Sequence, residues 1–289
     1  MQYEVLLFYK YVSIDDPEKL RDSQKELCES LCLKGRIIVA HNGINGTVEG
    51  TVDKTTVYIQ KMQKDKKFED ILFKKSMGTG GAFKKLQVRV RKDLVSDHTE
   101  EWGIDPKELT GKYLSAEELH TWIKSGKKFY IMDMRNNYEH KSGYFKDSIL
   151  PDIDNFRDLP KTLPKLKKYN DLPIVTVCTG GIRCERASGL LIKNGFKDVY
   201  QLKDGIVTYM EKYPNENFLG KLYVFDNRLV MGFQTDSPKH EVVGRCIVCD
   251  KKSENYVNCR DNICHRHFIC CVDCVETDGT ILCPQGCRT

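Results

Sequence analysis

The sequence has no long hydrophobic run, and this argues against a membrane-spanning protein. No stretch of its 289 residues approaches the roughly 18 uninterrupted apolar residues that a transmembrane helix needs. The chain starts with Met1-Gln2-Tyr3-Glu4, without the basic start, apolar run and cleavage site of a secretory signal. We therefore expect a cytoplasmic protein with no membrane role.

Cofactor motifs are scarce as well. The chain carries no flavin or nicotinamide fingerprint. Its only His-x-Glu sequence, His98-Thr99-Glu100, lies in a polar segment between predicted domains, so a non-haem iron site has little support. The sequence therefore gives no reason to expect a flavin or nicotinamide enzyme.

Cysteine is abundant but unevenly placed. Nine of the 13 cysteines lie between Cys246 and Cys287, and in a chain without a secretory signal such a cluster indicates metal binding more than disulfides. Eight of the nine form four pairs, which are Cys246 and Cys249, Cys259 and Cys264, Cys271 and Cys274, and Cys283 and Cys287. Eight thiolates suffice for two tetrahedral zinc sites of the structural kind.

The spacing leaves the partition of these zinc ligands open. A cross-braced arrangement joins the first pair with the third and the second with the fourth, whereas a sequential arrangement joins neighbouring pairs. Cys270 is the odd cysteine and is an alternative to Cys271, while His265 or His267 is an alternative to a thiolate. Because residues 246–289 contain few apolar side chains, we expect metal to hold this segment together.

Positive charge is concentrated in one part of the chain. The net charge is +5, but Lys54 to Lys92 contain twelve Lys or Arg residues against three acidic ones. Such a patch favours a polyanion, and the interleaved Tyr58, Phe68 and Phe83 suit stacking on unpaired bases, although each residue alone is equally well explained as surface or core. The candidate RNA contacts are Lys74, Lys75, Lys84, Lys85, Arg89 and Arg91.

Residues 1–97 are predicted to form a small α+β domain. A strand-like segment from Tyr3 to Val12 precedes an amphipathic helix that opens at Asp16-Pro17-Glu18. Two strands flank the Asn/Gly-rich segment 41–46, which favours a hairpin-like reversal. A second helix over 53–64 and a strand over 85–90 complete a βαββαβ order, the ferredoxin-like arrangement.

A polar linker over residues 98–111 leads to a second domain over 112–214. Ser115-Ala116-Glu117-Glu118 forms a capping box at the start of a helix. Strands at 129–132, 174–177 and 199–202 alternate with helices, which predicts a parallel sheet with helices on both faces. Residues 215–245 then connect to the cysteine-rich tail over 246–289.

The segment Cys178-Thr179-Gly180-Gly181-Ile182-Arg183-Cys184 joins a predicted strand to a predicted helix. Two adjacent glycines let successive NH groups point at one spot, where the helix dipole adds positive potential. Arg183 adds a fixed charge, and such surroundings lower the pKa of a thiol. We expect Cys178 to be a reactive thiolate and Thr179 to Cys184 to form an anion- or substrate-binding loop.

Several motifs around this loop carry a resemblance to a known family. Asp133-Met134-Arg135-Asn136, Gly143-Tyr144-Phe145, the Cys178 loop and Leu202-Lys203-Asp204-Gly205-Ile206 resemble a rhodanese domain over residues 112–214. In that family the loop cysteine carries a sulfane sulfur as a persulfide. The resemblance implies that Asp133 and Arg135 are structural, and it makes a sulfurtransferase with a persulfide on Cys178 the alternative function.

The segments before and after the rhodanese-like region make the resemblance more specific, to one group of rhodanese-like proteins. Gly43-Ile44-Asn45-Gly46-Thr47, Phe83-Lys84-Lys85-Leu86-Gln87-Val88 and the cysteine-rich tail, together with the central loop, resemble the bacterial tRNA uridine(34) hydroxylases. These rhodanese-like proteins install 5-hydroxyuridine at the wobble position of tRNA in an oxygen-dependent reaction. The resemblance implies tRNA modification with molecular oxygen as co-substrate, the anticodon region of tRNA rather than DNA as partner, and Cys178 acting at the uracil ring.

Overall fold

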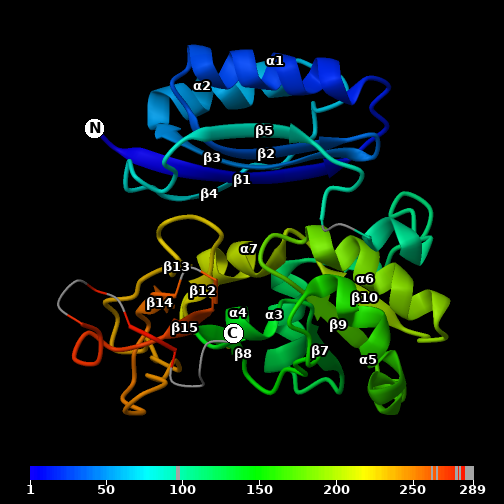
Figure 1. The fold of residues 1–289 in the computed structure, drawn as a ribbon. Coiled ribbons are helices and arrows are strands. Elements are labelled where there is room, and N and C mark those ends of the chain that lie inside the picture. Colours follow the sequence, from blue (N-terminus) through cyan, green and yellow to red (C-terminus); the bar gives the residue numbers. More distant parts are fainter. Residues whose placement is uncertain (96–97, 262, 265, 277–278, 280, 284–289) are drawn as a thin grey trace.

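The computed structural model describes residues 1–95, 98–261, 263–264, 266–276, 279 and 281–283. An N-terminal α+β domain lies against a central α/β domain, and a small cysteine-rich region packs beside the central domain (Figure 1). No helix among the described residues combines the length and apolarity that crossing a bilayer requires.

The N-terminal domain is a five-stranded sheet covered on one face by two helices (Figure 1). The strand order is β4-β1-β3-β2-β5. The apolar side chains of alternate strand residues, such as Phe8 and Ile37, pack under the helices. The elements are β1 (Tyr3–Tyr11), α1 (Pro17–Ser30), β2 (Lys34–Ala40), β3 (Gly43–Thr51), α2 (Val52–Gln63), β4 (Lys74–Met77) and β5 (Leu86–Val90).

The ferredoxin-like order is confirmed with one added strand. The predicted strand at residues 85–90 exists as β5, but it pairs in parallel with β2 at the edge of the sheet. The strand that completes the βαββαβ order is β4, which pairs with β1. Its sequence, Lys-Lys-Ser-Met, has too few apolar residues to indicate a strand.

The reversal between β2 and β3 is tighter than we predicted. Only His41 and Asn42 lie between the two strands, and Gly43 to Gly46 already pair in β3. The glycines are needed inside the strand because a Cβ on Gly46 would lie 2.4 Å from the ring of Phe8.

The predicted linker, residues 98–111, contacts the central domain. The segment contains a short 3₁₀ helix, Thr99–Trp102. Arg186 donates to the Ile104 carbonyl at 2.6 Å and forms an ion pair with Asp93 at 2.7 Å. Because Asp93 ends the N-terminal domain and Arg186 lies in α6, this buried pair fixes the two domains to each other.

The central domain has the predicted parallel sheet, with strand order β6-β10-β9-β7. Helices α3 and α7 pack on one face, and α5 and α6 pack on the other. The predicted capping box at Ser115 and Glu118 is present at the start of α3. These elements are β6 (Lys112–Leu114), α3 (Ala116–Lys124), β7 (Tyr130–Asp133), α5 (Leu159–Leu166), β9 (Ile174–Val177), α6 (Ile182–Lys193), β10 (Val199–Leu202) and α7 (Gly205–Lys212).

Short strands join the central domain to the C-terminal region. A buried ion pair between Arg135 and Asp133 supports them, and Arg135 also donates to the Gly143 carbonyl at 2.8 Å, in line with the structural role expected for both side chains. The short elements are α4 (Asn137–His140), β8 (Gly143–Phe145), β11 (Phe218–Gly220), β12 (Leu222–Tyr223), β13 (Val230–Met231), β14 (Tyr256–Asn258) and β15 (His267–Ile269).

Candidate active site and metal-ligand clusters

The Cys178 loop lies between the end of β9 and the start of α6. Gly181 adopts φ 101°, which a side chain would disfavour, and α6 begins at the next residue. The start of α7 packs directly against the loop. Gly205 approaches Gly180 so closely that a Cβ on Gly205 would lie 2.6 Å from the Gly180 carbonyl carbon. The expected strand, turn and helix arrangement is therefore present, and the helix already includes Ile182, Arg183 and Cys184 of the predicted loop.

Cys178 lies in surroundings that favour a thiolate. The side chain is fully buried, and the Gly181 amide donates to its sulfur at 3.2 Å. Burial by itself raises the pKa of this thiol, but a hydrogen bond from the Cys184 thiol, the charge of Arg183 and the loop amides outweigh burial and lower the pKa to about 6. The pKa of Cys184 is raised well above its ordinary value by burial and by the neighbouring Cys178, so Cys184 stays a thiol and acts as donor.

Arg183 is held by a buried carboxylate. Its two terminal nitrogens donate to the two oxygens of Glu139 at 2.6 and 2.9 Å, and Glu139 is fully buried. One of these nitrogens also donates to the Thr179 hydroxyl at 3.2 Å. The guanidinium is thus fixed in place beside Cys178, with part of its charge already balanced by Glu139.

A cavity of about 320 Å³ lies between the two domains, and Cys178 forms part of its wall. We name it the Cys178 cavity. The central domain contributes the loop from Cys178 to Arg183, and the open face of the N-terminal sheet contributes Arg36, Asn45 and Thr47. Aromatic rings of Phe83 and Phe225 also line it.

Sequence reasoning missed Phe225 altogether. This side chain is 49 % exposed and lies 5.8 Å from the Arg183 guanidinium, ring centroid to carbon. It belongs to the segment we predicted only as a connection, where no motif marked it. Hydrogen bonds from the Asn227 amide to the Ala82 carbonyl, and from its side chain to the Gly81 carbonyl, hold this segment to the N-terminal domain.

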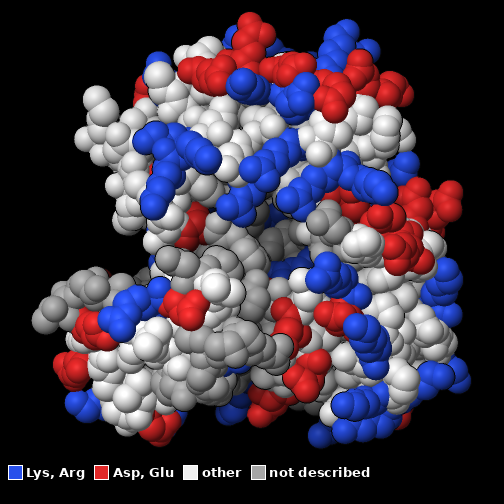
Figure 2. Space-filling model, viewed as in Figure 1, with Lys and Arg blue, Asp and Glu red and all other residues white. Residues whose placement is uncertain are grey.

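The predicted RNA contacts separate into two groups. Lys75, Lys84, Lys85, Arg89 and Arg91 are exposed, whereas Lys74 is buried at the interface between the domains. Figure 2 shows Lys and Arg side chains gathered on the N-terminal domain around β5, above the hollow between the domains. Of the aromatic residues in this region, Tyr58 and Phe68 are core residues and only Phe83 reaches the Cys178 cavity.

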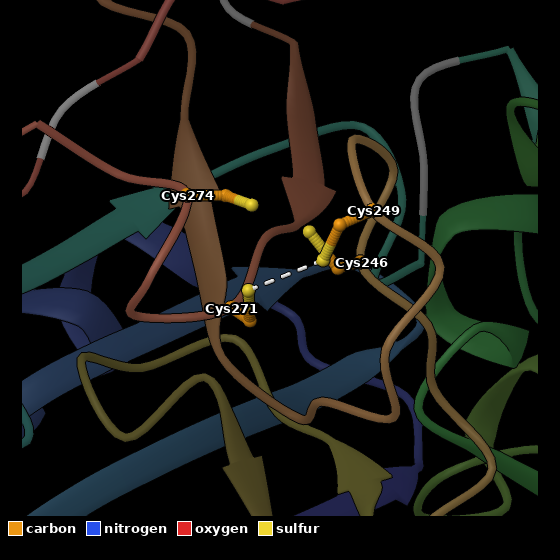
Figure 3. Close-up of side chains that lie close together, drawn as sticks. All are labelled: Cys246, Cys249, Cys271 and Cys274. Atoms are coloured by element: carbon orange, nitrogen blue, oxygen red, sulfur yellow. Dashed lines mark hydrogen bonds between the residues drawn. The ribbon is translucent and has the colours of Figure 1, made fainter.

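The cysteines of the C-terminal region converge in two groups. The first contains Cys246, Cys249, Cys271 and Cys274, whose sulfur atoms all lie within 4.8 Å of one another (Figure 3). The second contains Cys259, Cys264 and Cys283, and its expected fourth member, Cys287, lies outside the described residues. The first pair thus meets the third, and the second meets Cys283 of the fourth, as in the cross-braced alternative.

The other candidate ligands, Cys270 and His267, are not members of either cysteine group. Cys270 is buried, with its sulfur 3.8 Å from that of Cys246. His267 has its Nδ1 3.0 Å from the Tyr223 hydroxyl, and His265 lies outside the described residues. Four thiolates at such short mutual distances fit a tetrahedral metal ion with sulfur ligands.

Three segments of the chain match described protein families. Residues 3–94 match the "UPF0176 acylphosphatase like domain", residues 115–212 match the "Rhodanese-like domain" and residues 219–288 match "Rhodanase C-terminal". These segments correspond closely to the N-terminal domain, the central domain and the C-terminal region.

Curated relatives match over nearly the whole chain. A "tRNA uridine(34) hydroxylase" of Bacillus licheniformis is 45 % identical over 272 residues, covering 93 % of this chain and 83 % of its own. One of Staphylococcus carnosus is 41 % identical, covering 96 % and 90 %. Among solved structures, a rhodanese-like domain from Anabaena is 18 % identical over 40 % of this chain and 80 % of its own, with a TM-score of 0.33.

Proposed function

The chain belongs to the tRNA uridine(34) hydroxylase family, and from this premise we propose that it binds the anticodon region of tRNA and hydroxylates the wobble uracil in the Cys178 cavity. The observation that carries the assignment of the site is the Cys178 thiolate in the wall of a cavity that both domains build. A cavity of about 320 Å³ is at the small end of ligand sites, which suits one base rather than a whole nucleotide chain.

The chemistry needs a nucleophile at C6 of the ring. The Cys178 thiolate adds to C6, which breaks the C5–C6 double bond and leaves C5 as the electron-rich carbon of an enolate. Molecular oxygen then delivers one oxygen atom to C5, and a two-electron donor from the cell reduces the second oxygen atom to water. Loss of the C5 proton expels the thiolate from C6, restores the double bond and gives 5-hydroxyuridine.

The loop and the cavity walls position the base for this addition. The loop amides and the start of α6 stabilise negative charge, first on Cys178 and then on the enolate oxygen. Phe83 and Phe225 offer ring faces on which bases stack, and the exposed basic side chains around β5 attract the RNA backbone.

We assign a structural role to zinc in the two cysteine groups. Cys246, Cys249, Cys271 and Cys274 would hold one ion, and Cys259, Cys264, Cys283 and Cys287 would hold the other. Bound zinc cross-links segments that bury little apolar surface. Neither group belongs to the Cys178 cavity, so zinc takes no part in the reaction we propose.

Nucleoside mass spectrometry of tRNA tests the proposed function. Cells that lack the protein should lose 5-hydroxyuridine-type nucleosides, and the wild-type chain should restore them. The Cys178→Ser and Cys178→Ala variants should not, whereas Cys32→Ser, at an exposed cysteine beyond α1, should restore them fully. If Cys178→Ala restored hydroxylation, and if purified wild type moved sulfur from thiosulfate to cyanide, the persulfide sulfurtransferase would be the better assignment.

A further inference from the structure

A second cavity, of about 700 Å³, lies between the two domains and contains the buried Lys74. We name it the Lys74 cavity, and its lining includes Tyr9, Lys74, Tyr113, Glu185, Lys203 and Asp204. Tyr9 lines the Cys178 cavity as well, so the two cavities share this side chain as part of their walls. The Lys74 ammonium is 4.7 Å from the centroid of the same ring.

Lys74 is a buried basic group with few partners. Burial lowers the pKa of its ammonium more than the charges of Asp204 and Cys178 raise it, so a bound anion would favour the charged form. Its side chain is 4 % exposed, and its nitrogen lies 3.8 Å from the nearest Asp204 oxygen, which is too far for a good hydrogen bond. Among the described residues it makes no hydrogen bond within 3.5 Å. An ammonium has three N–H donors, and burying them without acceptors is costly, so the site is built to receive acceptor atoms.

Glu185 does not serve as the missing acceptor, because other donors already surround its carboxylate. The hydroxyls of Tyr9 and Tyr113 donate to it at 3.0 to 3.1 Å, and Thr110 and Gln201 donate at 3.2 and 3.1 Å. Burial also raises the pKa of Glu185, which disfavours its negative charge. This network holds Tyr9 in place in the wall that the two cavities share.

The charges around the cavity leave a cationic excess. Four lysines, at positions 10, 74, 107 and 203, face three acids, at positions 70, 185 and 204. Lys10 pairs with Asp70, and Lys107 donates to the Ser13 hydroxyl at 3.0 Å. Lys203 is exposed and forms no ion pair within the described part of the chain. Lys74 and Lys203 thus both line this cavity, and the acid nearest to Lys74 is Asp204, whose oxygen lies 3.8 Å from the Lys74 nitrogen.

We propose that the Lys74 cavity binds a backbone phosphate of the tRNA next to the uridine whose base occupies the Cys178 cavity. A phosphate offers several charged acceptor oxygens, which match the unused donors of Lys74. The shared wall at Tyr9 places this phosphate site beside the base site. The identification of the ligand as tRNA rests on the proposed function, whereas the phosphate site itself rests on Lys74 and its surroundings.

Binding of tRNA by the full chain at several salt concentrations tests this site. The Lys74→Met variant removes one charge and keeps an apolar side chain of similar length, and Lys61→Met, on the outer face of α2, is the control with the same net charge. Losing one single-strand phosphate contact should reduce the slope of log affinity against log salt by about 0.7. We expect Lys74→Met to show this change and roughly a ten-fold higher Kd, and Lys61→Met to show neither.

Asp204→Asn separates the phosphate site from a simple ion pair. Asn tolerates the left-handed conformation at this position, where φ is 66°. If Lys74 only served Asp204, Asp204→Asn and Lys74→Met would weaken folding and tRNA binding alike. For a phosphate site, Asp204→Asn should leave tRNA binding as tight as wild type or tighter, because it removes a carboxylate that competes for Lys74.

Two results would overturn the proposal. One is a salt slope for Lys74→Met equal to that of Lys61→Met, with thermal unfolding showing that both variants are folded. The other is inorganic phosphate binding that depends on Lys74 while tRNA binding does not, which would make the cavity a site for a free anion. If Cys178→Ala retained hydroxylation, the proposed function would fail, yet the effect of Lys74→Met on tRNA binding would still be measured independently.

Discussion

At the level of single residues, the surroundings of Cys178 and Cys184 shift the pKa values of these two neighbouring thiols in opposite directions. Both side chains are fully buried, yet the pKa of Cys178 falls and that of Cys184 rises. The reason is that Arg183 and the loop amides stabilise one thiolate, and a second thiolate beside it would be repelled. Cys184 therefore supports Cys178 as a hydrogen-bond donor.

The pH dependence of the reaction should report the ionisation of Cys178. In the proposed reaction the thiolate is the reacting form, so kcat/KM for tRNA should rise with pH around a midpoint near the pKa of about 6 and level off above it. Replacing Cys184 by Ala removes a donor to the thiolate and should shift the midpoint upward. A midpoint near 9.0, the ordinary pKa of a cysteine, in the wild type would contradict this account of the site.

Lys74 shows the limit of sequence reasoning about single charged residues. Lys74 and Lys75 are adjacent, but the alternation of a strand sends them to opposite faces. Lys74 is 4 % exposed against the central domain, and Lys75 is 47 % exposed beside Glu4. A surface that another domain covers cannot be distinguished in the sequence from one that solvent covers.

At the scale of elements, the joint between β9 and α6 depends on one glycine. Gly181 has φ 101°, and a Cβ there would lie 2.8 Å from the Tyr9 hydroxyl. Its amide also contacts the Cys178 sulfur. The conformation that starts the helix is thus the same one that directs an N–H group to the thiolate.

Gly181→Ala should damage both stability and the thiolate. The strained backbone should reduce the free energy of unfolding by about 1–2 kcal/mol, measured with urea, and displacement of the amide should raise the pH midpoint of kcat/KM. Gly195→Ala is the matched control, since Gly195 has φ 86° but no atom within 4 Å of a Cβ. It should lose similar stability and keep the wild-type midpoint; a shifted midpoint in Gly195→Ala would mean that the effect is not local to the loop.

At the scale of the whole molecule, residues distant in sequence build every site. The Cys178 cavity combines three strands of the N-terminal sheet (β1, β2 and β3), the central loop and Phe225. Contacts such as Arg186 with Asp93, and Asn227 with Gly81 and Ala82, hold these parts together. The cysteine groups likewise join segments that flank β14 and β15.

Paired cysteine substitutions test the cross-braced arrangement of the metal sites. Wild-type protein should contain close to two zinc ions per chain by native mass spectrometry. Cys246→Ser combined with Cys271→Ser should retain one ion, because both ligands belong to one site, whereas Cys246→Ser combined with Cys259→Ser should retain none. The sequential arrangement gives the opposite pair of results.

The sequence by itself determined features that depend on neighbouring residues. The capping box at Ser115, the apolar strands and the glycine-rich turn after Val177 specify their own conformation, so the element types and the strand-to-helix loop that holds Cys178 could be predicted. The paired cysteines also indicated metal sites, because their spacing is typical of tetrahedral sulfur ligands.

Features that depend on packing between distant segments could not be predicted from the sequence and appear only in the folded chain. The tertiary structure pairs β4 with β1, buries Lys74, brings Phe225 to the Cys178 cavity and joins the first cysteine pair to the third. None of these has a local signature, because each is fixed by which surfaces meet once the apolar faces are buried. The groups that lower the pKa of Cys178 therefore lie in or near one loop of the sequence, whereas the Cys178 cavity is formed by residues of both domains.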